Sequence, residues 1–245
     1  MDSLGLTTTI EATYERARIA SGFYDEVDVV VCDSTFTFLT APGAAADVER
    51  FLTEDESAVL EDMWEHLDDD DVVFDIGGGI GYYTVIAASK ASDGEVHAFE
   101  PNVRNTVRIE KHASMSGTAD RVSTHRVALT DKADSESSWI ANHRISGIQH
   151  TSGDRLVAFK SLPTPNVVKM DIQGAELDAI RGLTETLSRP ECRLVYVEVH
   201  ADEDIDYSLS EPEQASLEDT LRNCGFTVER FDEKDHEYFV RAMKE

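Results

Sequence analysis

"FDIGGGIGYYT", residues 74–84, places four glycines within five positions, and Asp75 stands two residues before the first of them. Glycine has no Cβ, so a ligand can lie directly against such a backbone, but each glycine also weakens a helix or strand. A turn that served packing alone would gain nothing from four of them. The stretch therefore predicts a ligand-binding loop at the carboxyl end of a strand.

Strands and helices alternate along the chain that follows. Apolar, β-branched segments at 72–76, 95–100, 122–129, 167–172 and 193–200 alternate with helical patterns at 82–91, 102–117, 175–188 and 216–226. This order predicts an α/β fold with a parallel, doubly wound sheet. The last two strand-like segments, 226–231 and 237–242, are joined by a short turn and must pair antiparallel, because a parallel pair needs a longer crossover. We expect a mostly parallel sheet that ends in an antiparallel hairpin.

The segment before residue 66 has a different pattern. Residues 10–20 have the spacing of a short helix, and apolar runs on both sides of residues 32–34 predict a β-hairpin. A further helix is expected over 53–67, where Thr53 and Glu56 have the spacing of a capping box. We therefore divide the chain into an N-terminal helix and hairpin, residues 1–65, which would cap the substrate side, and an α/β domain, residues 66–245.

The chain of 245 residues has a formal charge of −27, and its acidic residues are spread along the whole length. Hydrophobic residues make up 41 %, which is enough for a core and excludes global disorder. A nucleic-acid-binding surface would be basic, so no nucleic-acid partner is expected. The charge exceeds what solubility requires. It favours a halophilic chain, because concentrated salt screens the self-repulsion.

If this acidity is an adaptation to salt, the folded state should become more stable as salt rises. At about 1 M salt the screening length falls to about 3 Å, which weakens repulsion between neighbouring carboxylates. Melting temperatures in about 0, 1 and 3 M potassium chloride should therefore increase in that order. A melting temperature that stays flat or falls would contradict the halophilic interpretation.

The three cysteines, Cys32, Cys192 and Cys224, are far apart and have no metal-ligand spacing. We expect buried free thiols in a reducing cytosol, with neither a disulfide framework nor a zinc site. Residues 1–20 lack the apolar core of a signal peptide, and no run approaches the length of a membrane span. These features predict a cytoplasmic chain with no membrane partner.

The glycine spacing distinguishes between two cofactors. A dinucleotide site has the spacing G-x-G-x-x-G, which brings pyrophosphate to a helix N-terminus. Here the third glycine of that pattern would fall on Tyr82 or Thr84, where close packing requires a small residue. The spacing D-x-G-x-G-x-G instead suits S-adenosylmethionine, because Asp75 can balance the ammonium group of a cofactor that has no phosphate. Glu100, at the end of the next strand, can accept hydrogen bonds from both ribose hydroxyls.

The sequence resembles the FkbM family of S-adenosylmethionine-dependent methyltransferases over about residues 70–200. The matching stretches are "VVFDIGGGIGYYT", "VHAFEPN", "VVKMDIQGAELDAIRGL" and "LVYVEVH". The resemblance implies a Rossmann-like class I methyltransferase fold and O-methylation of a hydroxyl on a small molecule or glycan. Two positions differ from the family: Gly79 stands where asparagine is usual, and Gln173 stands where glutamate is usual.

From the motifs and this resemblance, we expect a set of residues to bind S-adenosylmethionine. They are Asp75, Gly77, Gly78, Gly79, Gly81, Tyr83, Thr84, Glu100, Pro101, Asn102, Ala128 and Asp171.

Catalytic residues are expected at the carboxyl ends of the strands at 167–172 and 193–200. An alcohol acceptor must lose its proton as its oxygen attacks the methyl group. Asp171 and His200 are the candidate bases, with His200 favoured because its ordinary pKa lies near neutral pH. Glu198 shares a strand face with His200 and would orient His200 or a substrate hydroxyl. Glu176 is interpreted as an acid that stabilises the start of the following helix through the helix dipole. Lys169 is interpreted as an ion-pair partner for one of the acids named here.

The remaining candidates and alternatives stay open. Trp139, His143, Arg144 and His150, in the polar stretch 135–155, are weaker candidates for acceptor binding. The acidic run 68–71 is expected to be a solvated turn rather than a metal site. No metal is expected. The alternative functions are a nicotinamide-dependent oxidoreductase and a protein that binds S-adenosylmethionine without turnover.

Overall fold

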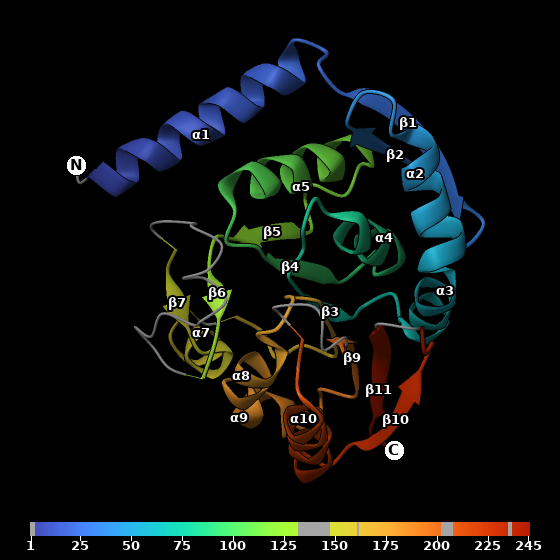
Figure 1. Cartoon of the computed structure of the whole chain (residues 1–245), viewed down its shortest axis with the longest axis vertical. Coiled ribbons are helices and arrows are strands. Elements are labelled where there is room, and N and C mark those ends of the chain that lie inside the picture. The colour runs from blue at the N-terminus through green and yellow to red at the C-terminus, as the bar shows by residue number, and fades with distance from the viewer. Residues whose placement is uncertain (1–2, 132–147, 161, 202–207, 235–236) are drawn as a thin grey trace. The chain divides into compact units, whose positions relative to one another are not determined.

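A computed structural model describes residues 3–131, 148–160, 162–201, 208–234 and 237–245. The chain divides into two compact units, whose helices and strands are labelled in Figure 1. The first unit contains residues 1–70 and 78–126, and the second contains residues 71–77 and 127–245.

The first unit carries the N-terminal helix and hairpin together with the strands and helices that follow the glycine loop. Its elements are α1 (Ser3–Ala20), β1 (Asp25–Val31), β2 (Ser34–Thr40), α2 (Ala45–Arg50), the π-helical turn η1 (Phe51–Asp55), α3 (Ser57–His66), α4 (Tyr82–Lys90), β4 (Glu95–Phe99), α5 (Val103–Met115) and β5 (Val122–His125). β4 and β5 pair in parallel.

The expected hairpin is confirmed: β1 and β2 pair antiparallel around a turn at Cys32 and Asp33, both with positive φ. The expected capping box is wrong. Glu56 is the residue before α3, and its side chain makes no capping hydrogen bond. Thr53 lies within η1, where its hydroxyl donates to the carbonyl oxygen of Glu49 at 2.8 Å. α2 is followed directly by η1, so the chain is already helical at Thr53, where the capping-box spacing predicted the start of a helix.

Helix α1 begins seven residues earlier than the sequence pattern indicates. Its apolar side packs on α5, where Ala12 and Ile19 contact Val103 and Val107. Burial of this stripe stabilises the helix through a partner that local periodicity cannot reveal.

The second unit carries the rest of the fold. Its elements are β3 (Val72–Ile76), β6 (Ala128–Leu129), β7 (His150–Thr151), α7 (Gly153–Lys160), β8 (Val167–Met170), α8 (Glu176–Arg181), α9 (Thr184–Leu187), β9 (Leu194–His200), α10 (Glu211–Asn223), β10 (Thr227–Phe231) and β11 (Glu237–Met243).

The strands of the second unit lie in the order β10-β11-β9-β8-β3. β3, β8 and β9 are parallel, whereas β11 pairs antiparallel with both β9 and β10. The expected antiparallel closing hairpin is therefore confirmed. With β4 and β5 the main sheet counts seven strands, so the expected mostly parallel α/β architecture is confirmed as well. Every residue of β8 and β9 is buried, as expected for strands covered on both faces.

Three expected elements have different boundaries in the structure. The strand expected over 122–129 ends at His125, and Ala128 and Leu129 form β6, which pairs with β7 in a small separate sheet. The helix expected over 175–188 is divided near Gly182, where an added Cβ would lie 2.2 Å from the carbonyl oxygen of Thr130. α10 begins at Glu211, earlier than expected, because Ser210 and Glu213 form a capping box.

None of the helices in the described parts of the chain combines the length and the apolarity that crossing a bilayer requires.

Candidate active site

The glycine loop adopts backbone conformations that favour glycine. Gly77, Gly79 and Gly81 have φ values of 83°, 53° and 98°. At Gly77, within the second unit, an added Cβ would lie 1.8 Å from the carbonyl oxygen of Asp171. The loop therefore begins in backbone contact with the segment after β8. Here the glycine is required by both conformation and space.

The rest of the loop packs against α5 in the first unit. A Cβ at Gly78 or Gly81 would lie 3.2 or 3.1 Å from atoms of Ile109. Gly81 is also the residue that precedes α4, in a left-handed conformation. The glycines thus bring the start of α4 close to α5. Within the loop, the N–H of Gly78 donates to the carbonyl oxygen of Phe99 at 3.3 Å, and the N–H of Gly81 donates to that of Gly78 at 2.8 Å.

Glu100 joins the two loops expected to bind the cofactor. Its Oε2 accepts a hydrogen bond from the backbone N–H of Gly79 at 3.0 Å, and its Oε1 accepts one from the backbone N–H of Asn102 at 2.7 Å. Glu100 is only 6 % exposed. The Glu100 carboxylate therefore lies where the glycine loop and the loop after β4 meet, and it accepts a backbone N–H from each of them.

His112 was not identified from the sequence, yet it holds the glycine loop from behind. Its Nε2 accepts the N–H of Leu39 at 2.8 Å, so Nδ1 carries the proton and donates to the carbonyl oxygen of Ile80 at 2.7 Å. Burial lowers the pKa of His112 to about 4, which keeps the ring neutral in this bridge. One side chain therefore connects the N-terminal hairpin to the glycine loop. The available signal was a histidine on the buried face of α5.

The other expected cofactor residues of the first unit have varied surroundings. The Tyr83 hydroxyl donates to Glu56 Oε2 at 2.7 Å, and Thr84 is fully buried in α4. The Asn102 side chain caps α5 by accepting the backbone N–H of Arg104. Pro101 is half-buried between Glu100 and this cap. The structure brings Glu100, Pro101 and Asn102 together, and it directs the Tyr83 hydroxyl toward Glu56.

Two expected cofactor residues lie in the second unit. Asp75 is buried on β3 and lies in register with Lys169 of β8. Ala128 lies in β6, in register with His150 of β7. Contact of either residue with a cofactor remains a prediction.

The three expected catalytic residues converge in the second unit. Asp171 directly follows β8, and Glu198 and His200 lie two residues apart on β9. One ligand atom from each of these side chains lies within 4.8 Å of the other two. Glu198 and His200 are buried, whereas the Asp171 side chain is 30 % exposed. Lys169 Nζ lies 3.5 Å from Asp171 Oδ2, so Lys169 pairs with an acid of the cluster as expected.

Glu176 adds a residue that the sequence interpretation had set aside. It is fully buried, and both of its carboxylate oxygens accept the backbone N–H of Gly174, at 2.8 and 2.9 Å. Its Oε1 lies 3.5 Å from His200 Nδ1, while Glu198 Oε1 lies 3.7 Å from His200 Nε2. Burial by itself lowers the pKa of His200, but the Glu176 carboxylate, aided by Asp171 and Glu237, outweighs it and raises that pKa. Glu176 therefore orients His200 as well as beginning a helix.

Gln173, one of the two departures from the family pattern, is exposed and has a φ of 51°. It lies in the turn between Asp171 and the Gly174–Glu176 contact. The carboxylates near His200 belong to Asp171, Glu176 and Glu198, so this cluster does not require a carboxylate at position 173.

The remaining candidates from the sequence have mixed outcomes. Trp139, His143 and Arg144 lie outside the described residues, and His150 is half-buried in β7. The acidic run 68–71 is not wholly a solvated turn. Asp71 is 3 % exposed, and its Oδ2 accepts a hydrogen bond from Arg193 at 2.6 Å within the second unit. Cys192 and Cys224 are buried free thiols as expected, whereas Cys32 is partly exposed.

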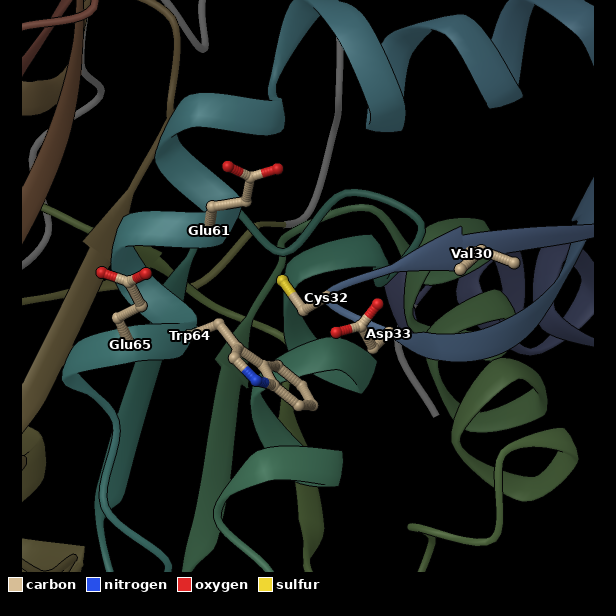
Figure 2. A pocket seen from close by; sticks show the side chains of 6 residues that line it. All are labelled: Val30, Cys32, Asp33, Glu61, Trp64 and Glu65. Carbon is tan, nitrogen blue, oxygen red and sulfur yellow. The ribbon is translucent and has the colours of Figure 1, made fainter.

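The first unit also has a pocket of about 390 Å³ between the hairpin turn and α3 (Figure 2). It is lined by Val30, Cys32, Asp33, Glu61, Trp64 and Glu65. Burial, together with the nearby carboxylates, raises the pKa of the Cys32 thiol to about 11, so the thiol stays protonated and is a poor nucleophile. In the part of the chain that the structure describes, Asp33, Glu61 and Glu65 do not bring three ligand atoms within 4.8 Å of one another. The residues that line this pocket therefore offer neither a reactive thiolate nor, among those the structure describes, a three-ligand metal group.

Comparison with solved structures identifies the fold. A methyltransferase FkbM from Methylobacillus flagellatus KT has a TM-score of 0.56 and 14 % identity over 72 % of this chain and 44 % of its own. Precorrin-6y C5,15-methyltransferase from Geobacter metallireducens GS-15 has a TM-score of 0.53 and 17 % identity, and covers 85 % of this chain and 94 % of its own. At such identities the likeness concerns the fold alone, and it confirms the Rossmann-like class I methyltransferase fold.

Sequence comparison identifies the family. Hexuronic acid methyltransferase AglP of Haloferax volcanii is 34 % identical over 155 residues, which are 60 % of this chain and 63 % of that relative. The match thus spans less than two thirds of the relative's length. Residues 75–228, which include the glycine loop, Glu100 and the Asp171–His200 cluster, match the methyltransferase FkbM domain. The chain therefore belongs to the FkbM methyltransferase family.

Proposed function

We propose that this chain is an S-adenosylmethionine-dependent O-methyltransferase whose acceptor is a sugar or another hydroxyl-bearing small molecule or glycan. The observation that carries the proposal is the Glu100 carboxylate, held between the glycine loop and the loop after β4 by the N–H groups of Gly79 and Asn102. The residues present fit the cofactor: the glycine backbone lets a ligand lie close to the loop, and a carboxylate such as Glu100 is the kind of group that accepts hydrogen bonds from ribose hydroxyls. The spacing D-x-G-x-G-x-G supports this cofactor over a dinucleotide.

The acceptor class is suggested by the family. The curated relative is a hexuronic acid methyltransferase, which supports a sugar acid, free or within a glycan, as the acceptor of this chain. The charge of −27 disfavours nucleic acid and anionic membrane surfaces as partners. We place the reaction in the cytoplasm, and we assign residues 1–65 to a cap that assists the substrate side.

The chain's own residues would act mainly by positioning. When bound, the cofactor supplies a methyl group on a sulfonium, which an acceptor oxygen displaces in line. Holding the acceptor at the correct distance and angle supplies much of the acceleration of such a reaction. Asp171, the partly exposed member of the cluster, would accept a hydrogen bond from the acceptor hydroxyl. His200, oriented by Glu176, is the second group that can take a proton or bind the acceptor oxygen.

A binding titration tests the cofactor assignment. The chain should bind S-adenosylmethionine and its demethylated product, and it should bind NAD at least tenfold more weakly, because Tyr82 and Thr84 occupy the positions where a dinucleotide loop needs glycine. The measurement is calorimetry in about 2 M potassium chloride, where the repulsion between acidic side chains is screened. Tighter binding of NAD would favour the oxidoreductase alternative. Binding of S-adenosylmethionine with no transfer to any sugar or sugar-acid acceptor would favour a binding protein without turnover.

A further inference from the structure

We propose that Asp171, Glu198 and His200 form a binding site for a divalent metal ion, and that this ion holds the oxygen atoms of an anionic acceptor. The evidence for the metal site is the arrangement of these side chains within the second unit. The part that concerns the acceptor rests on the proposed function.

The three side chains have the arrangement that a metal ion requires. Their ligand atoms lie within 4.8 Å of one another, so one ion placed among them can reach all three with only small rotamer changes. Glu198 and His200 lie on β9, and Asp171 directly follows β8, the parallel neighbour of β9. Two carboxylates and one imidazole favour a cation such as Mn²⁺ or Mg²⁺ over metals that prefer sulfur. The exposed part of Asp171 provides a path to solvent.

Glu176 is an independent observation that points to a metal ligand. A histidine that binds a metal through one ring nitrogen usually donates its other N–H to a carboxylate, which fixes the tautomer. His200 Nε2 faces Glu198, and its Nδ1 faces the buried Glu176 at 3.5 Å. Glu176 is itself held by the backbone N–H of Gly174. The ring is therefore oriented to present Nε2 toward Glu198.

Charge balance also favours a cation at this position. Glu237 lies in register with His200 on the neighbouring strand β11, which adds a further acid to the cluster. The surrounding acids of the second unit are Asp171, Glu176, Glu198 and Glu237. Lys169 pairs with Asp171, Lys234 pairs with Glu237, and His200 lies between Glu176 and Glu198, so these four carboxylates still outnumber the three side chains that can carry positive charge. A divalent ion would add positive charge to a group of this sign.

The same excess of negative charge bears on the acceptor. A sugar acid brings its own carboxylate, and it would be repelled by a cluster of this sign. A divalent ion between the acceptor and the three ligands turns the repulsion into attraction and positions the reacting oxygen. It also lowers the pKa of a bound hydroxyl, which eases proton loss at neutral pH.

Titration of the chain with Mn²⁺ tests the metal site without cofactor or acceptor. Full-length protein treated with EDTA is titrated with Mn²⁺ in about 1 M potassium chloride, where nonspecific attraction to surface acids is screened, and free Mn²⁺ is followed by electron paramagnetic resonance. We expect one retained site per chain. Glu198→Gln and Asp171→Asn should weaken it at least tenfold, and Glu176→Gln, which acts through His200, about 10- to 100-fold. Circular dichroism and melting curves check that each variant is folded.

Glu65→Gln is the matched control, because Glu65 belongs to another acidic group, beside Asp33 and Glu61 (Figure 2). It should leave Mn²⁺ affinity unchanged. The proposal is overturned if no site persists in salt, if folded Glu198→Gln and Asp171→Asn bind as tightly as wild type, or if Glu65→Gln weakens binding equally.

EDTA should also abolish methyl transfer while leaving S-adenosylmethionine affinity intact. Failure to bind S-adenosylmethionine would refute the proposed function and leave the Mn²⁺ result standing.

Discussion

Asp171→Asn and His200→Gln should each slow methyl transfer about 100- to 10,000-fold, which corresponds to about 3 to 5 kcal/mol of lost transition-state stabilisation. Both substitutions keep the approximate shape of the side chain. Each removes a group that takes the acceptor's proton or, with the metal ion proposed above, helps to hold the acceptor oxygen, and the two side chains lie in one cluster with Glu198. We expect cofactor affinity to stay near that of wild type, because Glu100 and the loop it holds are untouched. The measurement is single-turnover transfer to a sugar-acid acceptor at saturating S-adenosylmethionine.

Glu61→Gln is the matched control for these two variants, since Glu61 is an exposed acid of α3. It should keep the wild-type rate. If folded Asp171→Asn and His200→Gln both keep full rate, the cluster takes no part in the reaction. If only one of the two variants is slower than wild type, the side chain replaced in the other variant has a structural role. Loss of rate together with an equal loss of cofactor affinity would indicate a disturbed glycine loop, because Asp171 contacts Gly77 through its backbone.

Glu100→Ala should weaken binding of S-adenosylmethionine about a hundredfold. Two hydrogen bonds from ribose hydroxyls to a charged acceptor are worth about 3 kcal/mol, which corresponds to about two orders of magnitude in Kd. The substitution also releases the N–H groups of Gly79 and Asn102, so the two loops lose the carboxylate that orders them. Calorimetry with S-adenosylmethionine and its demethylated product measures the loss.

A matched control uses another acid of the same unit. Glu110, an exposed residue of α5 whose side chain lies 3.5 Å from Arg16, carries the same charge outside the glycine loop. Glu110→Ala should therefore bind the cofactor as wild type does. Wild-type affinity in Glu100→Ala would show that the ribose is bound elsewhere, and a similar loss in Glu110→Ala would show that net charge, rather than the contact, sets affinity.

The sequence alone determined the class of fold and its main elements. The strands at 72–76 and 194–200, the glycine loop and the closing antiparallel hairpin depend on local patterns: apolar runs, glycine spacing and the length of a connection. Such features are visible in a single sequence because each one acts over a few neighbouring residues. For the same reason the pair Glu198 and His200 could be assigned to one strand face from their spacing of two.

Boundaries that depend on distant partners were placed incorrectly. The helix expected over 175–188 is divided where Gly182 meets the backbone of Thr130. α1, which packs on α5 through Ala12 and Ile19, begins at Ser3 rather than at residue 10. The capping box at Thr53 had the correct spacing, but the chain remains helical through this position. Local propensities are weak, and tertiary packing decides between alternatives of similar energy.

Two residues acquire their roles only in the tertiary structure. His112 is separated by 73 positions from Leu39, whose N–H it accepts, and its other nitrogen reaches the glycine loop. Glu176 has the local pattern of a helix-start acid, yet it is buried beside His200, 24 positions later in the sequence, and helps to raise the pKa of that histidine. Periodicity reports which face of an element is buried, but it does not report which side chains meet there. Parallel strands bring together residues far apart in the chain, so the chemistry of this cluster is determined by their register and could not be predicted from the motifs alone.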